Sequence, residues 1–326
     1  MNAEFQLIDL QIPPELAGER LDSALARLLP AHSRTRIKGW IEAGEVRLGR
    51  RSCKPSDVVH AGARVELRIT APPARADVLP ETMHLVIVHE DRDCLVIDKP
   101  AGLVVHPGAG NPGHTLQNAL LGREPKLAAL PRAGLIHRLD KDTSGLLMVA
   151  RTPEAHTALT RQLMARTVER EYRAVCRGMM TGGGTVDEPI GRHRRDRLRM
   201  TVRQDGRPAV THYRVIERFP AHSFVSVRLE TGRTHQIRLH LAHLKYPIVG
   251  DPVYGGRLLR PRGAGDALAL CLREFKRQAL HAATLGFDQP STGRRLRFTS
   301  ALPADFQALL EALRTDAGSA APAGAA

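Results

Sequence analysis

A proline-rich stretch about a quarter of the way along the chain sets the strongest limit on how this sequence can fold. The stretch reads APPARADVLPE, with prolines at positions 72, 73 and 80. Proline fixes its backbone angle φ and donates no hydrogen bond, so neither a helix nor a central strand continues through such a segment. We therefore expect a small domain at residues 15–75, a linker at 76–82 and a large domain at 83–315.

The apolar residues of the small domain change from helical to strand spacing. Leu21, Leu25 and Leu28 recur on one helix face, and a second short helix is expected over residues 33–43. Residues 64–69 alternate between charged and apolar side chains, as a half-buried strand does. The small domain should therefore combine two helices with a short sheet.

The large domain contains many short apolar runs and few long helical patterns. Strands are expected at 85–88, 94–97, 103–105, 146–150, 171–177, 209–217, 223–230 and 279–287, and helices at 153–165 and 304–313. This order lacks the regular strand–helix alternation of a parallel α/β sheet, so we expect the α+β class with a mixed, largely antiparallel sheet. The small-residue segment 316–326 is expected to be a disordered tail.

The charge balance favours nucleic acid as a partner. Lys and Arg number 48 against 34 Asp and Glu, which gives a formal net charge of +14 and a pI of about 10.4. No apolar run of about 18 residues could span a bilayer, and the N-terminus shows no secretory pattern. The four cysteines form no CxxC pair, which favours reduced thiols and a cytoplasmic protein.

The segment 134–150, GLIHRLDKDTSGLLMVA, is the strongest candidate for a functional site. Its polar residues, at 137, 138 and 140–144, stand between two apolar flanks. Active sites are commonly built from polar side chains that a loop presents between buried strands. A solvated turn with ordinary salt bridges would have the same composition, so the residues alone leave both readings open.

Four segments resemble the motifs of the RluA-type pseudouridine synthases, in the order in which that family carries them. They are DKPAGLVVHP at 98–107, HRLDKDTSGLL at 137–147, REYRAV at 170–175 and TGRTHQIRLHLAHLKYPIVGDPVYG at 231–255. The sequences RLDSAL and SRTRIKGWIEAGEV resemble the S4 RNA-binding domain. The resemblance covers residues 15–315, and VVHPGAGNPGHT, GGTVDEPIGRH and GRPAVTHYRV are most similar to the D-type members.

The resemblance implies a pseudouridine synthase catalytic domain at residues 83–315, preceded by an S4 domain at 15–75. The implied activity is isomerisation of uridines in 23S rRNA, in the helix 69 loop for a D-type enzyme. The implied partner is 23S rRNA or a precursor of the large ribosomal subunit, bound by a monomer. A C-type relative acting on other 23S rRNA uridines is an alternative. A non-catalytic RNA-binding factor for ribosome assembly that keeps the fold is another.

The resemblance also assigns roles to individual residues. Asp140 is the catalytic aspartate, either as nucleophile at C1′ or as base at the 2′ position. Arg238, or less favourably Arg233, pairs with it. Tyr172 stacks on the extruded uracil, although a half-buried strand tyrosine would look the same. Arg138 fills the space that the flipped base leaves.

Further residues are expected to bind RNA through their charge or their place beside the motif. In the small domain and in the arginine-rich run 191–207, the candidates contact phosphates. A solvated face is the less favoured alternative for the run. The candidates are His137, Arg34, Arg36, Lys38, Arg194 and Arg195.

Two patterns that suggest cofactors do not hold. GAGNPG at 108–113 fits a dinucleotide-binding loop, but Pro112 removes a backbone donor and the surrounding βαβ unit is missing. Among the 15 histidines, His235, His240 and His243 fall in no metal-ligand frame. We therefore expect no metal and no small-molecule cofactor.

Overall fold

The computed structural model describes residues 5–29, 34–49, 51–70, 78–108, 110–196, 199–256 and 260–319. The chain divides into two compact units, a small unit within residues 1–77 and a large unit within 78–326. The expected linker at 76–82 overlaps this boundary. Residues 76–77 lie outside the described residues, but Asn118 donates to the Leu79 carbonyl at 2.8 Å and accepts from the Glu81 amide at 3.0 Å. Residues 78–82 are therefore anchored to the large unit.

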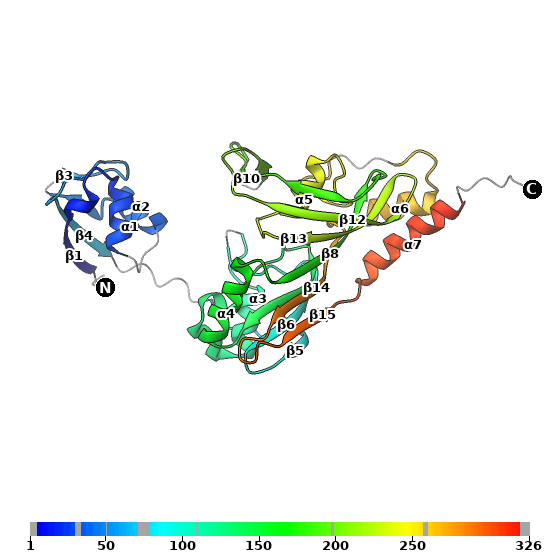
Figure 1. Cartoon of the computed structure of the whole chain (residues 1–326), viewed down its shortest axis with the longest axis horizontal. Coiled ribbons are helices and arrows are strands. Elements are labelled where there is room, and N and C mark those ends of the chain that lie inside the picture. The colour runs from blue at the N-terminus through cyan, green and yellow to red at the C-terminus, as the bar shows by residue number, and fades with distance from the viewer. Residues whose placement is uncertain are drawn as a thin grey trace, which may run out of the picture. The chain divides into compact units, whose positions relative to one another are not determined.

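The small unit packs two helices on an antiparallel sheet with the strand order β1-β4-β2-β3 (Figure 1). Leu25, Ile37 and Trp40 are buried in its core. The pairing of β1 with β4 extends the unit N-terminal to the expected boundary at residue 15. Its elements are β1 (Phe5–Gln11), a 3-10 turn (Pro14–Leu16), α1 (Leu21–Leu28), α2 (Arg34–Glu42), β2 (Val46–Leu48), β3 (Arg51–Ser52) and β4 (Arg64–Thr70).

A nine-stranded sheet forms the centre of the large unit, in the order β5-β6-β7-β14-β8-β13-β12-β9, with β15 paired to β14. All described pairs in it are antiparallel except β7 with β14, so the expected α+β fold with a mixed, largely antiparallel sheet is confirmed. The strands are β5 (Val86–Glu90), β6 (Cys94–Lys99), β7 (Ser144–Ala150), β8 (Glu169–Arg177), β9 (Gly184–Asp187), β12 (Val210–Arg218), β13 (His222–Leu229), β14 (Leu280–Asp288) and β15 (Arg295–Thr299).

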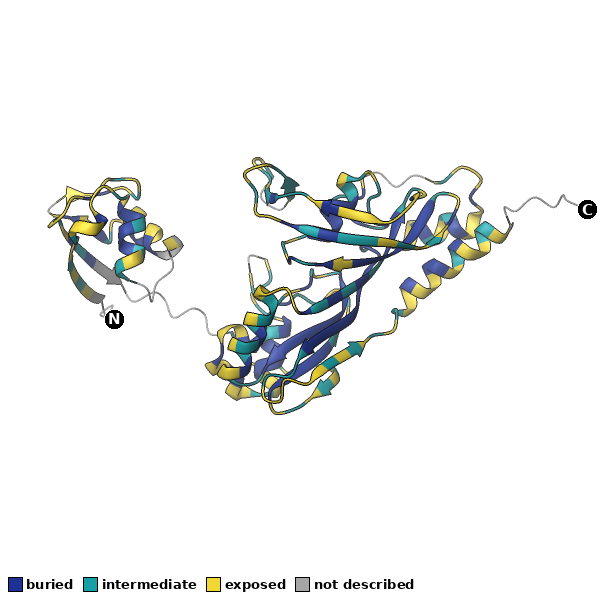
Figure 2. Ribbon diagram, viewed as in Figure 1, coloured by how far each residue is buried: buried dark blue, intermediate teal, exposed yellow. Residues whose placement is uncertain are grey.

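The middle of this sheet is covered on both faces, as the dark strands of Figure 2 show. Every residue of β7 is buried, which explains its unbroken apolar run. Gly145 has a φ of +112°, and a Cβ at this position would stand 2.3 Å from the Ala282 carbonyl oxygen of β14. Only glycine therefore lets β7 and β14 approach at the start of their parallel pairing.

Helices and short turns surround the sheet. α3 and α4 lie with the β5–β7 end, and α5 and α6 with the β12–β13 end (Figure 1). Outside the sheet, β10 and β11 pair as a separate two-stranded ribbon. These elements are α3 (Leu116–Arg123), 3-10 turns at Pro125–Ala129 and Pro131–Gly134, α4 (Pro153–Met164), β10 (Ile190–Arg192), β11 (Met200–Val202), α5 (Gln236–His243), α6 (Asp266–Glu274) and α7 (Ala304–Ser319).

The helix α7 continues further than the sequence analysis expected. Residues 316–319 belong to it, so the expected tail is helical there, while 320–326 lie outside the described residues. The Asp316 carboxylate accepts a hydrogen bond from the Gly265 amide at 2.7 Å, which ties the last turn to the start of α6. Among the described residues, none of the helices combines the length and apolar character needed to cross a lipid bilayer.

Candidate active site

Asp140 lies in the loop that leads into β7, and several hydrogen bonds fix this loop. The Thr143 amide donates to the Asp140 carbonyl at 3.1 Å. Gln278, just before β14, donates to the Thr143 hydroxyl at 3.1 Å. The backbone that carries Asp140 is therefore tied to the two strands that form the parallel pair.

Lys99, at the end of β6, supports the same loop from inside the protein. Its side chain is fully buried, and Nζ donates to the carbonyl oxygens of Pro100, Leu103 and Lys141 at 2.8, 2.9 and 2.9 Å. Burial lowers the pKa of Lys99 to about 7, against the opposing effect of nearby carboxylates that include Asp140. Three carbonyls match the three donors of an ammonium group, so Lys99 fixes the backbone beside Asp140.

Arg238 of α5 connects Asp140 to a second, fully buried carboxylate. Its Nη1 donates to Asp140 Oδ2 at 2.9 Å, while Nε and Nη2 donate to Asp251 at 2.7 and 2.8 Å. Burial lowers the pKa of Arg238, but the two carboxylates outweigh burial and raise it above its usual range. The two-point contact with Asp251 fixes the plane of the guanidinium and directs its remaining nitrogen at Asp140.

Asp251 is itself held in place by backbone groups. Its Oδ1 accepts the amides of Val253 and Tyr254 at 2.8 and 3.0 Å. Burial raises the pKa of the Asp251 carboxyl, yet Arg238 and these amides together hold it below its usual range. Asp251 is therefore a charged anchor for Arg238 inside the protein.

Tyr254 packs against Arg238 from the side of the β10–β11 ribbon. The guanidinium carbon of Arg238 lies 5.3 Å from the centre of the Tyr254 ring. The Tyr254 hydroxyl accepts the Met200 amide of β11 at 2.9 Å and contacts His235 Nδ1 at 3.0 Å. The ribbon is thus attached to the residues that position Arg238.

A cavity of about 530 Å³ opens at Asp140. This is within the usual range for sites that enclose one small molecule, and it is large enough for a single nucleotide. Tyr172 of β8 lines it, and burial raises the pKa of the Tyr172 phenol, with Asp140 adding to and Arg170 opposing that effect. The residues that line it include Asp140, Arg138, Arg170, Tyr172, Arg233 and Arg238.

The residues expected at the centre of the site come together in this cavity. Arg238, and not Arg233, forms the ion pair with Asp140, while Arg233 Nε donates to the Pro208 carbonyl at 3.1 Å. Arg138 is exposed at the cavity. His137 Nε2 accepts the Met148 amide at 3.2 Å, and burial, with Arg170, lowers its pKa to about 3. His137 is therefore neutral at physiological pH and holds β7 to the loop.

The arginines and lysines expected to contact phosphates are spread over both units. Arg34 is half exposed and pairs with buried Asp22 at 3.0 Å, so part of its charge is used within the fold. Lys38 is exposed near Glu42. Arg194 and Arg195 are exposed between β10 and β11. The Arg36 side chain lies outside the described residues.

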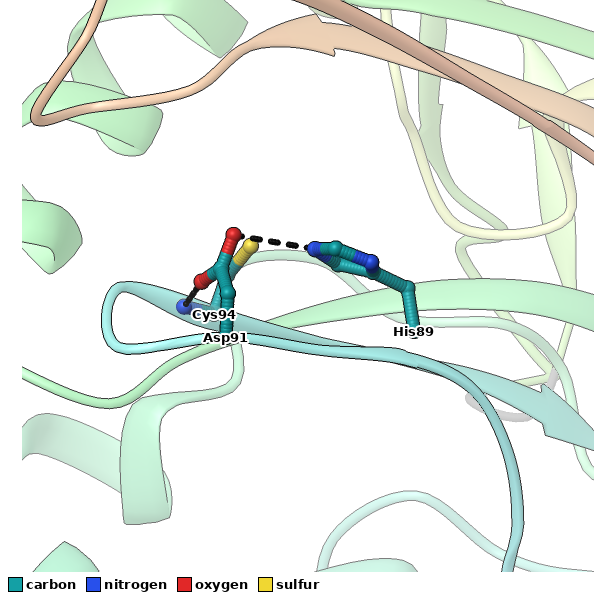
Figure 3. A group of neighbouring side chains, drawn as sticks. All are labelled: His89, Asp91 and Cys94. Atoms are coloured by element: carbon teal, nitrogen blue, oxygen red, sulfur yellow. Dashed lines mark hydrogen bonds and ion pairs between the residues drawn. The ribbon is translucent and has the colours of Figure 1, made fainter.

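One cluster among the described residues has the composition of a metal site. Figure 3 shows His89, Asp91 and Cys94 beside the turn between β5 and β6. His89 and Gln289 contact Asp91 Oδ2 at 2.9 and 2.6 Å, and the amides of Asp93 and Cys94 donate to Oδ1, both at 2.8 Å. Both carboxylate oxygens are thus used in holding the turn, and burial raises the pKa of the Cys94 thiol. The contacts indicate a turn cap.

Asp251, Tyr254, Lys99 and Arg170 are the site residues that the sequence analysis did not single out. All four lie inside the quoted motifs, so the motifs themselves carried the signal. Their roles depend on contacts between segments far apart in the chain. Of the three histidines considered as ligands, His240 is buried between the Thr211 hydroxyl and the Glu188 carbonyl, at 2.9 and 3.0 Å.

Comparison with known proteins agrees with this geometry. Residues 93–243 match the RNA pseudouridylate synthase family, and residues 19–65 match the S4 domain. The ribosomal large subunit pseudouridine synthase D of Xanthomonas campestris is 55% identical over 310 residues, which is 95% of this chain and 93% of that protein. The protein of the same name in Pseudomonas aeruginosa is 53% identical over 306 residues, which is 94% of this chain and 95% of that protein.

A solved structure supports the same assignment at the level of the fold. Human RNA pseudouridylate synthase domain containing 4 is 28% identical, with a TM-score of 0.55, and the match covers 70% of this chain and 93% of that one. The Asp140 loop lies inside the matched family segment, and the high identity to the bacterial proteins extends over both units. The chain therefore belongs to the RNA pseudouridylate synthase family, among its D-type members, and is an RNA pseudouridine synthase that carries an S4 domain.

Proposed function

We propose that this enzyme isomerises uridines in the 23S rRNA of the large ribosomal subunit and that Asp140 is its catalytic residue. The role of Asp140 is inferred from its ion pair with buried Arg238 inside a cavity large enough for a nucleotide. The substrate is inferred from the relatives, which are named ribosomal large subunit pseudouridine synthase D. The S4 domain and the net charge of +14 also favour an RNA substrate.

The reaction moves uracil from an N1 to a C5 linkage on the same ribose. The N1–C1′ bond breaks and its electron pair leaves with uracil, while Asp140 either bonds to C1′ or removes the 2′ proton. The ring turns and C5 bonds to C1′, while the Asp140–C1′ bond breaks on the first route or the 2′ proton returns from Asp140 on the second. The C5 proton then leaves and N1 takes up a proton. Atoms and electrons balance without an external oxidant or reductant. Arg238 contacts one oxygen of Asp140, and Oδ1 is the oxygen left to react.

The other cavity residues are proposed to hold the substrate. An internal uridine must leave its stack before C1′ can reach a carboxylate inside a cavity. Tyr172 is nearly buried in the cavity wall and offers a flat face for the uracil ring. Arg138 is exposed at the same cavity and is suited to fill the vacated position in the RNA.

The proposed target is the hairpin loop of helix 69, which the D-type resemblance implies. Mapping pseudouridines in rRNA from cells that lack this protein tests the target directly. We expect helix 69 pseudouridines to disappear and to return when the gene is restored. Loss at other 23S rRNA positions with helix 69 intact would favour the C-type alternative.

The role of Asp140 is tested by Asp140→Asn, which keeps the shape of the side chain and removes its charge. We expect single-turnover pseudouridine formation to fall by at least roughly 100-fold while RNA affinity stays close to normal. Asp187→Asn, at an exposed position of strand β9 and outside the cavity, is the matched control. Normal turnover by Asp140→Asn would show that another residue reacts. If the wild-type protein bound rRNA without forming pseudouridine, a non-catalytic assembly role would replace the proposal.

A further inference from the structure

Two buried side-chain polar atoms in the described part of the chain lack a hydrogen-bond partner. They are His106 Nδ1 and Arg170 Nε, and both residues line the Asp140 cavity. Buried polar groups are almost always paired because an unpaired one loses its bonds to water without compensation. Two exceptions at one cavity indicate that the cavity is built for a polar ligand.

Arg170 is the more costly of the two because it carries a charge. It is 5% exposed, and Nη2 donates to the Glu230 carbonyl at 3.2 Å. Among the described residues, none of the carboxylates forms an ion pair with it. Burial lowers the pKa of the Arg170 guanidinium, with Tyr172 opposing that shift. A buried cation without a counter-charge destabilises the free protein, so its retention points to a role when a ligand is bound.

The backbone around Arg170 is arranged to place the guanidinium at the cavity. Arg170 and Tyr172 are two positions apart on β8, so their side chains leave the same face of the strand. A Cβ at Gly232, which also lines the cavity, would stand 2.9 Å from Arg170 Nη1. The absence of a side chain at Gly232 therefore provides the room that the guanidinium occupies.

Burial separates Arg170 from three other arginines of the cavity, and the lack of a carboxylate partner among the described residues separates it from Arg238, which is equally buried but pairs with Asp140 and Asp251. Arg132, Arg138 and Arg166 also line it, but all three are exposed. Exposed arginines suit the phosphates of an RNA backbone, which remain near solvent. The part of a flipped nucleotide that reaches deepest is the base, and uracil presents two carbonyl oxygens as acceptors. The buried position therefore favours uracil over phosphate as the partner of Arg170.

We propose that the Arg170 guanidinium donates a hydrogen bond to a carbonyl oxygen of the flipped uracil and stabilises the negative charge that develops on the ring. This inference rests on the proposed function, because uracil is the ligand. When the N1–C1′ bond breaks, its electron pair leaves with uracil and spreads over N1 and the carbonyl oxygens. A fixed cation at such an oxygen lowers the barrier to this step. The pair then forms the new C5–C1′ bond.

The test combines an altered protein with an altered substrate. Arg170→Met removes the charge at similar length, and target RNA is prepared with 2-thiouridine or 4-thiouridine, whose sulfur is a weak acceptor. We expect Arg170→Met to slow single turnover at saturating RNA by roughly 10- to 100-fold with a much smaller loss of affinity. For one of the two thio substrates, the reduction in single-turnover rate of the variant should be smaller than the product of the reductions that each change causes alone. The reason is that both changes remove the same hydrogen bond. Penalties that multiply for both substrates would overturn the proposal.

Stability measurements distinguish this role from a structural one. Because Arg170 is a buried cation without a counter-charge, Arg170→Met should leave the unfolding midpoint of the free protein unchanged or raise it. A clear fall in the midpoint would assign Arg170 to the fold and contradict the proposal. Gly232→Ala is a second variant, expected to displace the guanidinium and to slow single turnover. Normal turnover by Arg170→Met beside an inactive Asp140→Asn refutes this inference alone, whereas an active Asp140→Asn refutes the proposed function.

Discussion

The Asp251→Asn variant tests whether the buried Arg238–Asp251 contact holds the large unit and its active site together. Asp251 accepts four hydrogen bonds, three through Oδ1 and one, from Arg238 Nε, through Oδ2. Asparagine can keep the three bonds at Oδ1 with its carbonyl oxygen, but its amide group then faces the Arg238 Nε donor. The variant loses the negative charge and gains a contact between two donors. Breaking a buried ion pair in this way costs about 3 to 5 kcal/mol.

Asp266→Asn provides a matched control, because it makes the same chemical change in an exposed pair. Asp266 is 95% exposed and lies 2.9 Å from Arg260, a separation similar to that of the buried pair. An exposed pair contributes about 0 to 1 kcal/mol, since water screens the charges. The comparison therefore isolates burial as the cause of the larger cost.

Unfolding of the small unit provides an internal reference for this measurement. Trp40 is the only tryptophan of the chain and is buried in the small unit, so its fluorescence follows that unit during urea denaturation. Circular dichroism follows the strands of the large unit as well. We expect Asp251→Asn to shift the circular dichroism transition and leave the Trp40 transition unchanged. A cost below about 1 kcal/mol, or equal costs for the two variants, would refute the reasoning.

Three further predictions concern pH, RNA binding and metal dependence. Burial, with Arg177, lowers the pKa of His222 to about 4, so unfolded chains take up its proton first as the pH falls below about 6.5. The free energy of unfolding should therefore fall between pH 6.5 and 4. In urea denaturation, His222→Gln should reduce the slope of that free energy against pH by about 1.4 kcal/mol per pH unit, and an unchanged slope would contradict this. Residues 11–75 hold 12 basic and 7 acidic residues, so deleting residues 1–77 should weaken RNA binding. The slope of log K against log salt concentration should become shallower by about 0.7 to 0.9 for each lost phosphate contact. Single turnover at saturating RNA should change little, and a truncated protein that binds normally but reacts slowly would place the small unit in catalysis. The enzyme should remain active in excess EDTA when the RNA substrate is confirmed to stay folded. Loss of activity that zinc restores would contradict this prediction.

The sequence motifs were enough to predict which residues meet at the Asp140 cavity but not the contacts that hold them there. Asp140 and Arg238 are 98 residues apart, and their pairing was expected because both stand in motifs of one family. Asp251 and Lys99 bind charged or carbonyl groups from other segments, which no local spacing reveals. Arg170 could not be separated from other arginines without knowing that its Nε is buried and unpaired.

Departures from the predicted elements have local explanations. The helix α5 was not predicted, because six of its residues are buried and its apolar and polar positions do not separate into two faces. The apolar run at 103–105 suggested a strand, but Val104 makes only an isolated bridge to Thr115. The start of α7 was predicted, but its last turn depends on the contact between Asp316 and Gly265, which the sequence does not show.

The parallel pair of β7 and β14 has a consequence for the time at which the enzyme becomes competent during synthesis. The pairing joins Ser144 to His281. After Ser144, a further 137 residues must therefore be synthesised before the two halves of the sheet can meet. Pairings of such long sequence separation form late, because the intervening chain must first be closed into a loop. On the ribosome, the small unit can fold while most of the large unit is still being translated. We expect nascent chains to acquire affinity for RNA well before they can modify it, with activity arising only once β14 has emerged.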